Sequence, residues 1–153
     1  MKSIEIEEPA KEVLLVEDNP GDIRLMREAF RETNASIRLH VAYDGAEAIA
    51  FLTRKPPHTD APRPGIILLD LRLPKMDGQD VLAHIKRDES LRSIPTVIVS
   101  ASESETDISK SYQLHANCYL TKSTQLDAFE SLVMSINDFW LKKAKLPQRA
   151  PSA

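Results

Sequence analysis

Short apolar runs alternate along the chain with segments whose apolar residues recur at three- and four-residue spacing. Runs too short for a core helix and rich in branched residues predict buried strands, and the helical spacing predicts amphipathic helices. Strands are expected over residues 11–16, 36–42, 66–69, 96–99 and 117–120. Helices are expected over residues 22–31, 46–52, 79–87, 107–114 and 126–141. This alternation predicts an α/β fold with a parallel sheet, right-handed crossovers and helices on both faces.

The composition of single segments places them within this sheet. The apolar run at residues 13–16 and segment 66–69 carry no polar residue before their ends, as strands covered on both faces require. Segment 36–42 alternates apolar with polar residues, which favours the edge of the sheet. Asn19 and Pro20 suit the N-cap and the first position of a helix, so we expect the first helix to begin there.

Length and composition predict one globular domain. It is expected over residues 11–142, with a flexible segment before it (1–10) and a partly disordered tail after it (143–153). The net charge of −3 argues against nucleic acid as a partner. The single cysteine excludes an intrachain disulfide and fits a reducing compartment. Because no apolar stretch is long enough for a membrane span and the N-terminus is acidic, we expect a cytoplasmic protein with no membrane partner.

Polar side chains follow four of the five predicted strands at the point where each strand ends. They are Glu17 and Asp18, then Asp70, Ser100 and Lys122. The carboxyl ends of strands in a doubly wound parallel sheet border one crevice. We therefore expect three carboxylates, one hydroxyl and one ammonium to meet there. Such a pocket suits a divalent cation and a phosphoryl group.

The carboxylates favour a magnesium site. Two like charges about 4 Å apart repel by about 4 kcal/mol at an effective dielectric of about 20, so three carboxylates need a neutralising ion. Mg²⁺ takes oxygen ligands, whereas zinc prefers histidine and cysteine, and the four histidines show no metal-ligand spacing. Lys122 and Ser100 can each contact a phosphoryl oxygen. Asp70 is then the nucleophile that forms an aspartyl phosphate.

Each of these residues also has a plain structural interpretation. An acidic pair after a strand is commonly a solvated turn, and Asp70 alone could simply end a strand. Ser100 and Lys122 carry no signal when taken singly. Their coincidence at the ends of four strands favours the functional interpretation.

Over residues 11–141 the chain resembles the response-regulator receiver domains of two-component signalling. The motifs VLLVEDNP, LLDLRLPKMDG, IPTVIVSAS and NCYLTKS occur in the order and spacing of that family. The resemblance implies a flavodoxin-like (βα)5 fold with strand order 2-1-3-4-5. It also implies a Mg²⁺ site, in which Mn²⁺ can replace Mg²⁺, formed by Glu17, Asp18, Asp70 and the backbone carbonyl of Arg72.

The same resemblance implies roles for the residues around this site. Asp70 would accept the phosphoryl group, Lys122 would contact it, and Ser100 and Tyr119 would move together as a switch. Tyr119 could instead only pack on the preceding helix, and this alternative stays open. Most receivers have a cis-proline after the site lysine, whereas Ser123 follows Lys122 here. Because a non-proline cis bond costs about 3–4 kcal/mol, we predict a trans bond and a slightly shifted lysine.

Within this family the chain is most similar to phytochrome-associated response regulators of cyanobacteria and other bacteria. The segments NPGDIRLMREAF, YQLHANCYLTKS and INDFWLKKAKLP are typical of them. The implied partner is a sensor histidine kinase with a phytochrome sensor, and the chain would be a phosphoacceptor rather than an enzyme. A Mg²⁺-dependent phosphohydrolase stays open, although Arg72 stands where such enzymes commonly carry a second carboxylate. An inactive pseudo-receiver also stays open, although the complete acidic set argues against it.

The end of the chain is more apolar than a solvated helix end requires. Phe139, Trp140 and Leu146 are predicted to form a homodimer interface, which the subgroup resemblance supports. The alternative is that these side chains pack on the sheet of their own chain.

Overall fold

Five parallel strands form one sheet in a computed structural model of the chain, which describes residues 10–33, 36–123 and 125–147. The strands are β1 (Lys11–Val16), β2 (Ile37–Ala42), β3 (Ile66–Leu69), β4 (Thr96–Ser100) and β5 (Cys118–Thr121). The helices are α1 (Pro20–Glu32), α2 (Gly45–Leu52), α3 (Gly78–Arg87), α4 (Glu105–Gln113) and α5 (Leu126–Ser135), followed by the π-helix η1 (Ile136–Lys143). The order β2-β1-β3-β4-β5 confirms the predicted topology and the edge position of β2.

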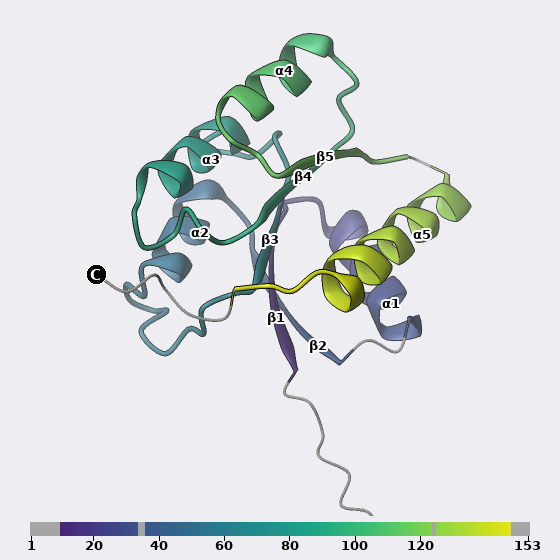
Figure 1. The fold of residues 1–153 in the computed structure, drawn as a ribbon, viewed down its shortest axis with the longest axis horizontal. Coiled ribbons are helices and arrows are strands. Elements are labelled where there is room, and N and C mark those ends of the chain that lie inside the picture. The colour runs from purple at the N-terminus through teal and green to yellow at the C-terminus, as the bar shows by residue number, and fades with distance from the viewer. Residues whose placement is uncertain (1–9, 34–35, 124, 148–153) are drawn as a thin grey trace, which may run out of the picture.

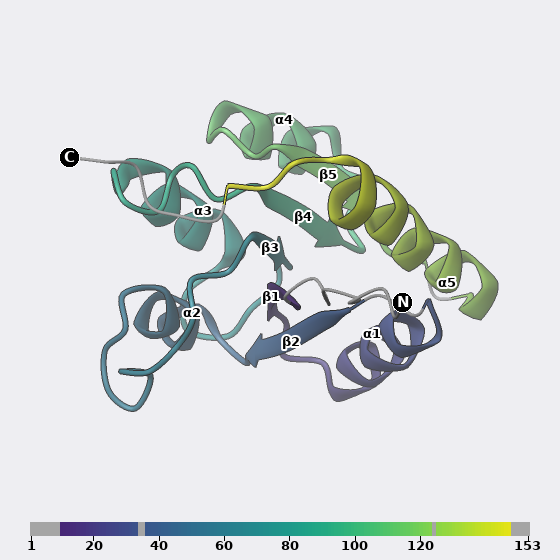
Figure 2. The ribbon, with the colours of Figure 1, turned by 60° about the horizontal axis from the view of Figure 1, so that its bottom comes forward.

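Two helical layers cover the sheet. α1 and α5 lie on one face, and α2 and α3 lie on the other (Figure 1). Figure 2 shows the same layers after a rotation, with α4 beside β5. Side chains alternate between two apolar cores, so Leu14 and Ile67 pack beneath α2 and α3, whereas Val13 and Ile66 pack beneath α1 and α5. Both faces of the central strands are therefore buried, and their polar residues lie at the ends.

Side-chain caps fix where the helices begin. The Asn19 Oδ1 accepts a hydrogen bond from the Asp22 amide at 3.1 Å, and Pro20 is the first helical residue, as the sequence predicted. Asp44, Asp77 and Ser104 cap α2, α3 and α4 in the same way. Each of these helices thus begins at the end of the sheet where the strands finish.

The prediction of one continuous helix over residues 126–141 is wrong for its second half, which is not α-helical. The α-helix ends at Ser135, and a π-helix continues to Lys143. Ile136 and Leu141 are five residues apart and are both buried. Because a π-helix bonds residue i to residue i+5 and has a wider turn than an α-helix, it brings both side chains to the buried face.

The first residues of the predicted C-terminal tail lie against the sheet. Residues 144–147 run from the last helix across the sheet, in yellow in Figure 1. Leu146 packs on the core beneath α1 and α5, and its Cδ1 lies 3.5 Å from the position of a Cβ built on Gly65, just before β3. The rest of the predicted tail, and all of the predicted flexible N-terminal segment except Ala10, lie outside the described residues. No helix in the described part of the chain has the length and apolar character to cross a bilayer.

Candidate functional site

Three carboxylates meet where β1 and β3 end. Glu17 and Asp18 follow β1, Asp70 follows β3, and the two strands pair in register from Val13 with Ile66 onward. One oxygen from each carboxylate lies within 4.8 Å of the other two. Glu17 and Asp70 are only 3% and 5% exposed, whereas Asp18 is exposed. The strand register therefore brings together the three carboxylates that the sequence predicted.

Lys122 lies against this cluster. Its Nζ donates hydrogen bonds to Glu17 Oε2 at 2.9 Å, Asp22 Oδ2 at 2.9 Å and Asp70 Oδ2 at 3.1 Å. The Lys122 backbone amide also donates to the Ser100 carbonyl at 2.8 Å, which ties the loop after β5 to the end of β4. The ammonium therefore spans from β5 to the carboxylates that follow β1 and β3.

The loop after Lys122 has the predicted geometry. Among the described residues the cis peptide bond joins Pro56 and Pro57, and the bond from Lys122 to Ser123 is trans. The predicted small shift of the lysine stays a prediction. The three carboxylates that surround the Lys122 ammonium hold its position.

The carboxylates and the lysine shift one another's protonation. Burial and the charge of Asp70 raise the pKa of Glu17 from 4.5 to about 7, although the hydrogen bond to Lys122 opposes this rise. Burial alone would lower the pKa of Lys122, but hydrogen bonds to Asp22 and Glu17 and the charge of Asp70 hold it above its ordinary value. One ammonium therefore leaves an excess of negative charge in the site, which a divalent cation can neutralise.

The donor set fits a hard divalent cation. Glu17, Asp18 and Asp70 offer three oxygen ligands, the kind that Mg²⁺ prefers, and two of them are buried. The Arg72 amide donates to Asp70 Oδ1 at 3.3 Å, so the residue is next to the cluster. The role of its carbonyl as a further ligand stays a prediction.

The two predicted switch residues contact the loop after β4. Ser100 is fully buried, and its Oγ accepts a hydrogen bond from the Ser102 amide at 3.2 Å. Tyr119 is half-buried, and its hydroxyl donates to the Ser102 carbonyl at 2.8 Å. Tyr119 also packs against the core beneath α2 and α3, so both predicted interpretations of this ring remain open.

Sequence reasoning missed two residues of the site. Asp22 was assigned only to the predicted first helix, but it is a third carboxylate partner of Lys122. Its position in the first turn of α1, just after the acidic pair, was the available signal. Gly78 begins α3, where a Cβ would lie 2.1 Å from the Asp70 carbonyl oxygen and 2.5 Å from the Leu71 Cα. Only glycine lets this helix approach the Asp70 loop so closely.

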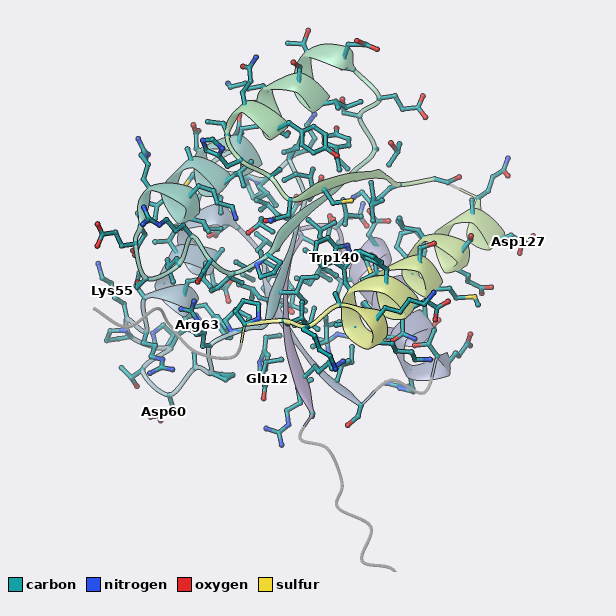
Figure 3. All side chains as sticks on the ribbon, in the orientation of Figure 1. Glu12, Lys55, Asp60, Arg63, Asp127 and Trp140 are labelled. Atoms are coloured by element: carbon teal, nitrogen blue, oxygen red, sulfur yellow. The ribbon has the colours of Figure 1, made fainter. Side chains whose placement is uncertain are left out.

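The three predicted interface residues lie in different environments. Phe139 is 55% exposed and packs edge-on against Trp140, with ring centroids 5.2 Å apart. Trp140 lies between the last helix and the sheet, where it contacts the core beneath α1 and α5 (Figure 3). Leu146 contacts the same core. Trp140 and Leu146 therefore pack on the sheet of their own chain, as the alternative predicted. Phe139 is the predicted interface residue that stays exposed.

Comparison with known proteins identifies the class of this domain. Residues 13–134 match the response regulator receiver domain family, and the chain belongs to this family. Response regulator Rcp1 of Synechocystis sp. (strain PCC 6803) is 45% identical over 139 residues, which are 91% of this chain and 95% of Rcp1.

Two solved structures show the same likeness. The phosphorylated cyanobacterial phytochrome response regulator RcpA is 47% identical with a TM-score of 0.87, covering 90% of this chain and 99% of RcpA. The Mn²⁺-bound form of Rcp1 is 44% identical with a TM-score of 0.86, covering 90% of this chain and 99% of Rcp1. The predicted similarity to phytochrome-associated regulators is therefore confirmed.

Proposed function

We propose that this chain accepts a phosphoryl group from a sensor histidine kinase on Asp70, in a reaction that requires Mg²⁺, and then signals by binding a partner. The observation that carries the proposal is the buried Asp70 carboxylate, which lies beside the Lys122 ammonium and two further carboxylates in a receiver domain. The chain would act as a stoichiometric phosphoacceptor in the cytoplasm rather than as an enzyme.

The contacts of Asp70 prepare its carboxylate for attack. Lys122 Nζ holds Oδ2 at 3.1 Å, and the Arg72 amide holds Oδ1 at 3.3 Å, so the plane of the carboxylate is fixed. An Asp70 oxygen attacks phosphorus while the bond to the donor nitrogen breaks, and the donor imidazole leaves with the electron pair. Lys122 then contacts a phosphoryl oxygen. Bound Mg²⁺ supplies positive charge for the carboxylate and phosphoryl oxygens. Positioning and charge neutralisation therefore carry the reaction.

The proposed kinase has a phytochrome sensor. The support is the similarity to RcpA, which is a cyanobacterial phytochrome response regulator, together with its coverage of 90% of this chain.

The charge of the site explains why the proposed transfer requires Mg²⁺. A phosphohistidine donor brings further negative charge to an already acidic site, and the two repel each other. We therefore expect transfer to be slow when Mg²⁺ is withheld.

Phosphotransfer to wild type, Asp70→Asn and Asp80→Asn tests the acceptor. Phytochrome histidine kinases and phosphoramidate serve as donors, with Mg²⁺ or with EDTA. We expect label with Mg²⁺ in wild type and in the exposed control Asp80→Asn, and none in Asp70→Asn. Label that survives in Asp70→Asn would place the acceptor elsewhere. Sustained phosphate release from esters would favour a phosphohydrolase, and no label from any donor would favour a pseudo-receiver.

We also propose that the chain forms a homodimer through its last helical segment. Phe139 and Met134 are 55% and 53% exposed, and contact with a second copy of the chain would bury these large apolar side chains. Light scattering on Phe139→Ser is expected to show a monomer. Tyr43→Ser, which removes an aromatic ring that is 52% exposed at the end of β2, should leave the dimer intact. A monomeric wild type, or an unchanged dimer in Phe139→Ser, would overturn this proposal.

A further inference from the structure

An aspartate in the first turn of α4 turns its carboxylate away from its own helix. Ser104 and Asp107 have the spacing of a capping box, in which each residue bonds the backbone amide of the other. The Asp107 amide does donate to Ser104 Oγ, at 3.3 Å. The Ser104 amide, however, donates to Ser102 Oγ at 3.2 Å instead of to Asp107. The sequence therefore predicts an ordinary capping box, but in the structure the Asp107 carboxylate does not bond the Ser104 amide and has another partner.

That carboxylate joins two loops of the site. Asp107 Oδ2 accepts a hydrogen bond from Ser102 Oγ in the loop after β4. The same oxygen forms an ion pair with Arg72 Nη2 at 3.4 Å, and the Arg72 amide donates to Asp70 Oδ1. Because the Arg72 side chain is 77% exposed, this ion pair contributes little. The charge-assisted bond to Ser102 is the stronger link.

Ser102 in turn contacts both predicted switch residues. Its amide donates to Ser100 Oγ at 3.2 Å, and its carbonyl accepts from the Tyr119 hydroxyl at 2.8 Å. Its own hydroxyl is bonded to Asp107. A movement of Ser102 therefore changes the hydrogen bonds of the Ser100 and Tyr119 side chains together.

We infer that Asp107 is a positioning residue for the phosphorylation switch. By holding Ser102 against the start of α4, it keeps the Ser100 hydroxyl and the Tyr119 ring in the arrangement of the unphosphorylated chain. The Ser100 hydroxyl must leave the Ser102 amide before it can turn to a phosphoryl group on Asp70, so the bond between Asp107 and Ser102 opposes the switch. The part of this inference that concerns the phosphorylated state rests on the proposed function. The part that concerns the contacts of Asp107 with Ser102 does not.

Amide hydrogen exchange in the metal-free, unphosphorylated protein tests the first step. The reporters are the amides of Ser102 and Ser104, which are both bonded into the network. Asp107→Ala is expected to speed their exchange by about tenfold, the effect of losing one charge-assisted hydrogen bond. Asp107→Asn keeps an acceptor and should lie between wild type and Asp107→Ala. Glu105→Ala removes an exposed carboxylate from the same helical turn and should leave both amides unchanged.

The rate of labelling by phosphoramidate with Mg²⁺ tests the second step. Asp107→Ala should be labelled several-fold faster than wild type and Glu105→Ala, because the bond that opposes the switch is gone. Unchanged exchange at both amides in Asp107→Ala would overturn the inference. Faster exchange with an unchanged labelling rate would also overturn it, since Asp107 would then be only structural. If wild type takes no label, the proposed function fails, and the exchange result alone decides whether Asp107 positions Ser102.

Discussion

Glutamine in place of Glu17 should remove a pH dependence of stability from the metal-free protein. Glu17 is 3% exposed and lies beside Asp70, and folding raises its pKa from 4.5 to about 7. Between these two values the folded protein binds more protons at this carboxyl than the unfolded chain does. The free energy of unfolding therefore falls as the pH rises through this range, and the full loss remains above it.

The pKa difference sets the size of this effect. One pH unit corresponds to about 1.4 kcal/mol, so the full loss is about 3 kcal/mol. Glutamine resembles the protonated carboxyl in shape and has no proton to lose. The stability of Glu17→Gln relative to wild type should therefore increase by about 2 to 3 kcal/mol between about pH 5 and about pH 8. Taking the difference between two proteins at each pH cancels the titration of the shared groups that do not interact with Glu17.

Urea denaturation in EDTA at both pH values measures this difference. Glu130→Gln, which changes an exposed carboxyl on α5, is the matched control and should keep a constant difference from wild type. Mg²⁺ at the higher pH should reduce the advantage of Glu17→Gln, because the ion stabilises the ionised carboxylates. A difference between Glu17→Gln and wild type that does not change with pH would refute the reasoning.

Two further substitutions test the site and its support. Lys122→Met should lower the unfolding free energy of the metal-free protein by about 3 kcal/mol or more, because it leaves buried carboxylates without their cation; chemical denaturation measures this, and a value equal to wild type would contradict it. Gly78→Ala should lower the unfolding free energy by more than about 2 kcal/mol, because its Cβ would meet the Asp70 backbone. Gly21→Ala, whose Cβ would meet only the side-chain oxygen of Asn19, should change it by less than about 1 kcal/mol, and equal losses in the two glycine variants would contradict the steric argument.

The sheet could be predicted because the apolar pattern of each strand depends directly on which of its faces are buried. β3 and the part of β1 from Val13 to Val16 are buried and form continuous apolar runs, whereas the edge strand β2 alternates. The second half of the last helix could not be predicted in this way. Ile136 and Leu141 face the same core at a spacing of five, and only the packed structure shows that the backbone widens to permit it.

The site could be predicted only as far as strands position it. Glu17 and Asp70 follow paired strands, so topology alone places them together. Asp22 and Asp107 come from the first turns of helices, and each suits an ordinary helix start. Their contacts with Lys122 and Ser102 depend on how two helices dock against neighbouring loops. The spacing of apolar and polar residues in the sequence does not show how a helix docks against a loop that is distant in the chain.

The packing of Leu146 also decides how this protein can be handled in an assay. Leu146 lies against Gly65, which precedes β3, whereas Asp70 follows β3. About 16 Å of extended strand therefore separates Gly65 from Asp70. A tether attached at Pro147 therefore starts far from Asp70, the proposed phosphoacceptor. Protein captured on a sensor surface through this end would present Asp70 to a kinase in solution, so transfer could be followed on immobilised molecules without the surface blocking the approach.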